Sequence, residues 1–179
     1  INEKSELSST VIPPRLPYQT PIDLSLIPPE NWRLHQVSTF YSRNALDQLG
    51  RYVREDLDYV MDRELLFRVA NNYEIVLDDR PYAAFRRHAE SKSMSSFIPF
   101  GEEFGRLYLE SSSKNQKDQR FKQRMARFFH AKGYLHLAKY HPNLAESNRA
   151  FTQAVKIYPE YLLTRKFWLT WVKRVLKMI

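Results

Sequence analysis

The chain has 179 residues, of which 43% are apolar, and it contains no cysteine. This length suits one domain with an appendage, and the apolar share can build a folded core, which excludes an intrinsically disordered chain. The lack of cysteine excludes disulfides and thiolate metal sites, and no apolar run approaches the roughly 18 residues of a membrane span.

The net charge of +8 is unevenly distributed along the chain. Residues 1–100 hold 12 Lys/Arg and 14 Asp/Glu and carry −2, whereas residues 101–179 hold 16 and 6 and carry +10. A basic half is typical of proteins that contact phospholipid, nucleotides or nucleic acid.

The first fifty residues contain little regular structure by pattern. Residues 1–31 hold six of the ten prolines, which predicts extended loop. The chain opens on Ile1 without a charged and then apolar leader, so we expect it to be a piece of a longer polypeptide. Residues 42–50 predict a helix of about two turns that begins at a Ser or Asn and stops at Gly50.

Residues 59–71 place five apolar side chains on one helical face and turn Arg63 and Arg68 away from it, which predicts an amphipathic helix. Glu74–Leu77 and Tyr82–Phe85 are short strand candidates, joined by turn residues around Asp78 and Asp79. The apolar face of the helix consists of Val60, Leu65, Leu66, Val69 and Ala70.

From Gly101 onward the pattern is helical. We expect helices over Gly101–Glu110, Gln119–Tyr140, Leu144–Tyr158 and Tyr161–Ile179, with a polar loop over residues 111–118. The pair over 119–158 resembles one tetratricopeptide unit, since Ala150–Pro159 follows the small, aromatic, Ala and Pro pattern of its second helix. A single unit predicts an appendage packed on its neighbour and no repeat array.

An acidic side chain stands at the start of the helix predicted over residues 59–71. Asp62 and Glu64 favour a helix N-terminus through its dipole and free N–H groups, which is one explanation for them. The other is catalytic: a rigid carboxylate in a cleft can take the proton from an attacking acceptor hydroxyl. The residue pattern leaves both explanations open.

A basic cluster follows the strand candidates. Arginine grips phosphate oxygens with a planar fork, lysine acts as a point charge, and histidine can bind a divalent metal. Such a set could hold the diphosphate of a leaving nucleotide, or it could be a solvated surface loop. The cluster consists of Arg86, Arg87, His88, Ser91 and Lys92.

Four segments in order resemble the C-terminal half of family-2 glycosyltransferases, and they cover roughly residues 30–95. They are His35–Arg43, Ala45–Gly50, Tyr59–Arg68 and Ala83–Lys92. The resemblance implies a glycosyltransferase-A fold and inverting sugar transfer from a nucleotide-sugar, assisted by Mg²⁺ or Mn²⁺. The acceptor would be a saccharide or a lipid-linked saccharide in a bacterial-type enzyme.

The resemblance also assigns roles. Asp62 would be the catalytic base, and His88 would lie beside the metal ion. The donor diphosphate would be held by Arg86, His88, Ser91 and Lys92, and the acceptor side would be lined by His35, Gln36, Ser38 and Glu64.

The implied fold class is α+β and predominantly α-helical. A partial glycosyltransferase-A region of short strands and helices over residues 1–100 would be followed by a helical bundle over residues 101–179. The nucleotide-binding strands and the metal-binding Asp-x-Asp of the family precede the matched region, so we expect this chain alone to lack donor binding and turnover. Asp56-Leu-Asp58 has the same letters, but it stands just before the helix that carries Asp62, where the family has a turn. We therefore do not expect it to be the metal-binding motif.

Residues 165–179 form an amphipathic pattern with aromatic and aliphatic side chains opposite Lys and Arg. The apolar face could dock on the preceding helix pair, or it could lie on an anionic membrane surface, and both hold if the face is only partly covered. We therefore expect a cytoplasmic protein, peripheral on the inner face of the membrane where that contact forms. A non-enzymatic helical adaptor is the alternative function, and we expect no nucleic-acid partner because no nucleic-acid motif is present.

Overall fold

A computed structural model describes residues 22–28, 36–50, 52–78, 80–84, 96–112, 114–164, 167–169 and 171–172. The chain divides into two compact units, Ile1–Ser95 and Ser96–Ile179, against the predicted division after residue 100. The described residues are predominantly helical, which confirms the helical part of the predicted fold class.

The N-terminal unit is built around helix α2 (Met61–Asn72). Two single-turn 3₁₀ helices, η1 (Leu24–Leu26) and η3 (Gln36–Ser38), and the short helix α1 (Arg43–Gln48) precede it. The predicted apolar face of α2 is confirmed, because all five of its residues are buried. Phe67 is buried as well, so the covered surface of α2 is wider than the pattern indicated.

Specific hydrogen bonds hold the short elements of this unit. The backbone N–H of Ile22, just before η1, donates to the carbonyl of Ala70 on α2 at 2.8 Å. The Tyr73 hydroxyl at the end of α2 donates to Gln48 Oε1 of α1 at 2.6 Å. Helix α1 stops as predicted, since Gly50 takes a φ of 72°, a left-handed conformation that glycine adopts without a Cβ clash.

The predicted strand hairpin is not formed in the residues that the structure describes here. Residues 74–78 and 80–84 have irregular backbone, so the strand predictions are wrong over these residues. An isolated two-stranded hairpin is marginal in water, and the described chain offers no further strand to extend it. The Asp78 carboxylate instead accepts from the Arg80 backbone N–H at 3.0 Å, from the Arg80 side chain and from the Tyr82 hydroxyl.

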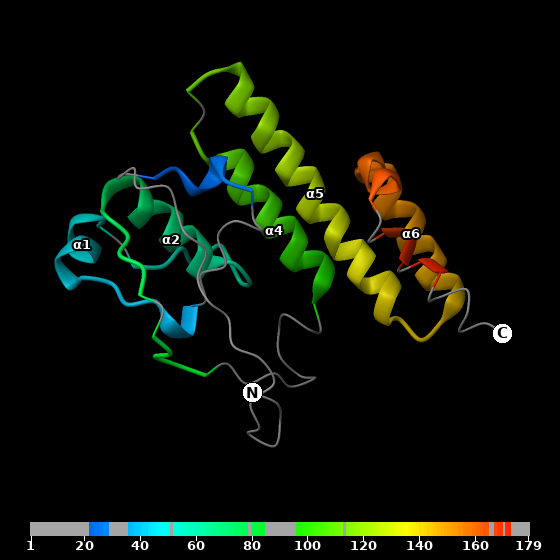
Figure 1. The fold of residues 1–179 in the computed structure, drawn as a ribbon, viewed down its shortest axis with the longest axis horizontal. Coiled ribbons are helices and arrows are strands. Elements are labelled where there is room, and N and C mark those ends of the chain that lie inside the picture. Colours follow the sequence, from blue (N-terminus) through cyan, green and yellow to red (C-terminus); the bar gives the residue numbers. More distant parts are fainter. Residues whose placement is uncertain are drawn as a thin grey trace. The chain divides into compact units, whose positions relative to one another are not determined.

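The C-terminal unit consists of three successive helices, α4 (Phe97–Glu110), α5 (Gln116–Tyr140) and α6 (Leu144–Ile157), drawn as neighbours in Figure 1. Helix α4 begins four residues earlier than predicted, because Pro99 is tolerated in a first turn, where no intrahelical N–H bond is needed. Helix α5 begins three residues earlier because the Asn115 side chain accepts from the Asp118 backbone N–H at 2.9 Å and so caps it.

Helices α4 and α5 lie antiparallel with their backbones in close approach. A Cβ on Gly101 would lie 2.5 Å from the Phe129 carbonyl oxygen, and one on Gly133 would lie 2.5 Å from the Phe97 carbonyl oxygen. Next to these glycines, the Phe104 and Phe129 rings stack with their centroids 4.1 Å apart. At the level of the glycines the two helices are therefore in backbone contact, and at the next level they pack through a stacked aromatic pair.

The other face of α5 packs against α6. The carbonyl of Ala138 lies four positions before Pro142, which has no N–H to donate, and the buried Ser147 hydroxyl of α6 donates to it. At the opposite end of α6, Arg124 Nε donates to the Tyr158 hydroxyl at 3.1 Å. Between these bonds lies a core of buried side chains: Ala131, Leu135, Ala138, Ala150, Phe151, Ala154, Tyr158, Tyr161 and Phe167.

The predicted closing helix begins later than expected. Pro159–Leu163 forms a 3₁₀ helix, η4, and the backbone of Thr164 is extended. The Thr164 hydroxyl accepts from the Phe167 backbone N–H at 3.3 Å, so a cap at Thr164 starts the helical residues that follow. Among the described residues, no helix has the length and apolar character needed to cross a bilayer.

We expect Gly133→Ala to lower the free energy of unfolding by about 1–3 kcal/mol, the usual cost of overpacking a tight contact. This loss should appear although alanine is favoured over glycine inside a helix by up to about 1 kcal/mol. Urea unfolding followed by circular dichroism measures it. Gln123→Ala, at an exposed position of the same helix, should change the value by less than about 0.5 kcal/mol, and an equal effect of both changes would contradict the close approach.

Ser147→Ala should also destabilise the unit, because it removes the hydroxyl that donates to the buried Ala138 carbonyl. A lost buried hydrogen bond of this kind costs about 1–3 kcal/mol, which a thermal melt will record as a midpoint several degrees lower. The matched control is Asn148→Ala, one residue along α6 and exposed. A melting midpoint of the Ser147 variant equal to that of the control would show that the hydroxyl does not stabilise the packing of α5 against α6.

Candidate functional site

Asp62 lies in the first turn of α2, as the sequence predicts. Its side chain keeps 20% of its surface exposed, whereas the residues that follow it from Glu64 to Phe67 are buried. Its carboxylate Oδ2 lies 3.7 Å from Nε of Arg63. The helix therefore holds this carboxylate at the edge of the core with a cation beside it and with access to solvent.

Tyr41 completes the immediate electrostatic surroundings of Asp62. Burial raises the pKa of the Tyr41 phenol, the Asp62 charge raises it further, and Arg63 lowers it in part. Burial lowers the pKa of Arg63, against the influence of Asp62 and Tyr41. Tyr41 thus stays protonated at neutral pH and keeps a hydroxyl that can donate a hydrogen bond.

Apart from Glu64, the other predicted site residues divide into two groups. Gln36 and Ser38 lie on η3, and both are exposed. The rest lie outside the described residues, so their predicted roles stay predictions: His35, Arg86, His88, Ser91 and Lys92.

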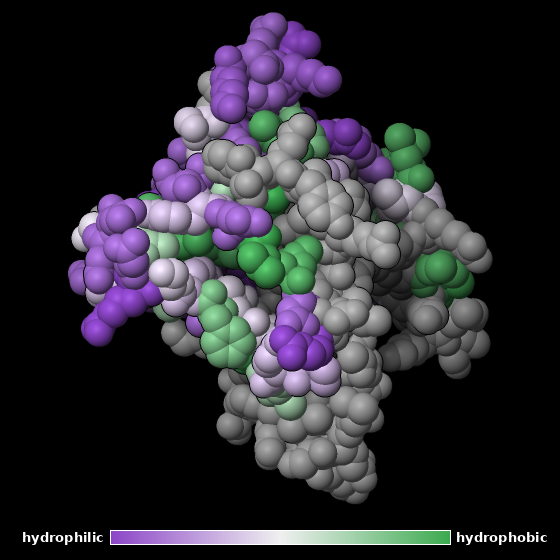
Figure 2. All heavy atoms as spheres, turned by 60° about the vertical axis from the view of Figure 1, so that its left-hand side comes forward, coloured by the Kyte–Doolittle hydropathy of each residue, from purple (hydrophilic) through white to green (hydrophobic). Residues whose placement is uncertain are grey.

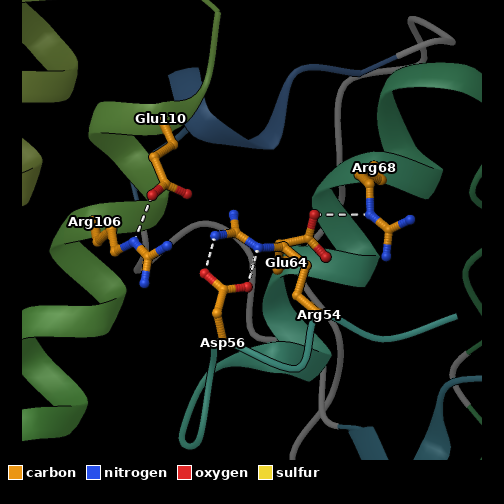
Figure 3. A network of polar contacts seen from close by, with 6 residues as sticks. All are labelled: Arg54, Asp56, Glu64, Arg68, Arg106 and Glu110. Atoms are coloured by element: carbon orange, nitrogen blue, oxygen red, sulfur yellow. Dashed lines mark hydrogen bonds and ion pairs between the residues drawn. The ribbon is translucent and has the colours of Figure 1, made fainter. Parts of the chain in front are cut away.

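Glu64 differs from Asp62 in its surroundings. It is buried, and its Oε1 lies 2.7 Å from Arg68 Nε, one turn further along α2 (Figure 3). The second Glu64 oxygen has no hydrogen-bond partner among the described residues. Figure 3 also shows two pairs that lie nearer to solvent, Arg54–Asp56 and Arg106–Glu110. The predicted acceptor-side role of Glu64 stays a prediction, whereas its ion pair with Arg68 is a contact that the structure shows.

An exposed aromatic pair is the feature that the sequence analysis missed. The rings of Phe40 and Tyr82 meet edge to face with their centroids 5.9 Å apart, and Phe40 keeps 78% of its surface exposed. Arg80 lies over the Tyr82 ring at 5.3 Å, and Asp78 accepts from the Tyr82 hydroxyl. Figure 2 shows hydrophobic residues, in green, lying among hydrophilic ones, in purple, on the face that it presents. Phe40 and Tyr82 are far apart in the sequence, so no local pattern indicates their contact.

The divalent metal implied by the resemblance finds no ligand set in the described part of the chain. No group of three or more His, Cys, Asp or Glu side chains lies together there. Asp56, which carries the letters of the metal motif, pairs with Arg54 at 2.5 Å.

Comparisons with family models, with curated proteins and with solved structures give no match to this chain.

We expect Arg68→Met to cost about 2 kcal/mol or more, because it leaves the Glu64 carboxylate buried without its cation. Arg106→Met is the matched control, since it breaks a pair of the same spacing whose side chains are 43% and 38% exposed. Such an exposed pair contributes less than about 1 kcal/mol. Chemical denaturation measures the free energy of unfolding of both variants. Equal losses of this free energy would show that the burial of Glu64 adds nothing to the cost of breaking its ion pair.

Proposed function

We propose that the N-terminal unit is the acceptor-side part of a glycosyltransferase that uses a nucleotide-sugar donor. Support comes from the ordered motifs over residues 30–95, with Asp62 in the first turn of α2 as the observation that carries the proposal. A partial glycosyltransferase-A region is part of this proposal.

In the proposed reaction an acceptor hydroxyl attacks the anomeric carbon of the donor sugar. Asp62 takes the hydroxyl proton while the new glycosidic bond forms, and the bond to the nucleoside diphosphate breaks on the opposite face of the sugar. The carboxylate suits this task because α2 fixes its position and its exposed edge leaves a path for the acceptor. Arg63 balances its charge before the proton arrives.

The neighbours of Asp62 have supporting parts in the same proposal. The protonated Tyr41 hydroxyl can orient the acceptor, and Gln36 and Ser38 supply exposed polar groups on η3. Arg86, His88, Ser91 and Lys92 are proposed to hold the departing diphosphate, with Mg²⁺ or Mn²⁺ neutralising its charge.

Asp62→Asn tests the proposal in the natural gene product. Removal of a general base should lower kcat by about 100-fold or more, and release of nucleoside diphosphate from UDP-, GDP- and dTDP-sugars in the presence of saccharide acceptors measures it. Asp118→Asn is the matched control, since Asp118 also stands in the first turn of a helix but belongs to the C-terminal unit.

Two results would contradict the proposal. One is a gene product that consumes none of the donors with any acceptor of the panel. The other is an Asp62→Asn variant that transfers sugar at the wild-type rate.

A further inference from the structure

The last described residues of the C-terminal unit divide sharply into buried and exposed side chains. Phe167 is 3% exposed, and its ring lies 5.1 Å from that of Phe151. Other described apolar residues near it in the sequence are exposed, and Leu163 keeps 87% of its surface exposed. The exposed apolar side chains of this segment are Leu162, Leu163, Trp168, Leu169, Trp171 and Val172, which we call the terminal apolar patch.

This division bears on the two alternatives that the amphipathic pattern left open, docking on the helix pair and contact with a membrane. Docking on the helix pair accounts for Phe167, which belongs to the core shared with α5 and α6. The Trp168 indole N–H donates to the Leu162 carbonyl at 2.7 Å, so one exposed aromatic ring is held in place at the surface. Among the described residues of the segment, Phe167 is therefore anchored in the core, whereas the six residues of the terminal apolar patch are exposed.

The charge of the same segment is wholly basic. Residues 165–179 contain five Lys/Arg and no Asp/Glu. Arg165, Lys166 and Lys173 stand within three positions of the terminal apolar patch in the sequence. Residues 101–164 add to this field, since they hold 11 Lys/Arg and 6 Asp/Glu and carry +5.

We propose that the terminal apolar patch docks on an anionic lipid surface. Tryptophan and leucine side chains enter the boundary between headgroups and acyl chains, and neighbouring Lys and Arg contact anionic headgroups. Charge complementarity favours lipid over an uncharged protein groove, and the indole rings favour an interface that is apolar on one side and wet on the other. The inference rests on the C-terminal unit alone and is independent of the role of Asp62.

Vesicle partition measures this docking directly. Purified chain is mixed with vesicles of phosphatidylcholine and phosphatidylglycerol, or of phosphatidylcholine alone, and both co-sedimentation and tryptophan emission are recorded. We expect binding and a blue-shifted emission with the anionic vesicles, and weak binding to the neutral ones. Raising NaCl from about 0.1 M to about 1 M should weaken the binding, because the Debye length falls from about 10 Å to about 3 Å.

A double variant and a matched control assign the binding to the patch. Leu163→Ser with Trp171→Ser should weaken partition by about tenfold or more, since both side chains lose their apolar insertion. Val76→Ser with Leu109→Ser removes two other exposed apolar side chains, 82% and 61% exposed, and should leave partition unchanged.

Four outcomes would overturn the inference. The first three are no partition onto anionic vesicles, equal partition onto neutral vesicles, and equal weakening of partition by the control variant. The fourth is a chain that does not bind lipid but binds RNA or associates with itself, where the patch variant abolishes that RNA binding or self-association. Circular dichroism of both double variants establishes that they are folded. Since the readout is binding and involves no sugar transfer, its failure is distinguishable from failure of the proposed enzymatic function.

Discussion

The close approach of α4 and α5 is the constraint on which the C-terminal unit depends. Without side chains at Gly101 and Gly133, the two backbones come near enough for a Cβ at either position to overlap a carbonyl oxygen of the other helix. Packing at this distance allows Phe104 and Phe129 to stack face to face at the next level. Dispersion contacts are individually small, so a well-fitted interface of this kind gains its stability from their number.

The sequence predicted the helices well because their cues are local. Apolar spacing located α2, α5 and α6, and Gly50 and Pro159 marked stops that the structure retains. The prediction of a strand hairpin was wrong because strand formation depends on pairing partners that a local pattern does not reveal. The late start of the closing helix depends on the Thr164 hydroxyl, whose role as a cap appears only once Pro159–Leu163 has turned as a 3₁₀ helix.

The candidate site was predictable in position and less so in its surroundings. The acid at a helix start located Asp62, and Arg63 is its neighbour in the sequence, but Tyr41 is brought to it by folding. Asp62 and Glu64 are two residues apart on one helix, yet one is partly open to solvent and the other is buried in an ion pair. Spacing alone treats two such carboxylates alike, and only the packing of α2 separates them.

The shared use of α5 has a consequence for how the C-terminal unit assembles. One face of α5 is occupied by α4 and the opposite face by α6, through Gly133 and Ala138 respectively. Neither the pair α4–α5 nor the pair α5–α6 can form alone without leaving an apolar stripe of α5 in water. Loss of either neighbour would expose apolar side chains of α5, so we expect the three helices to unfold as one cooperative unit.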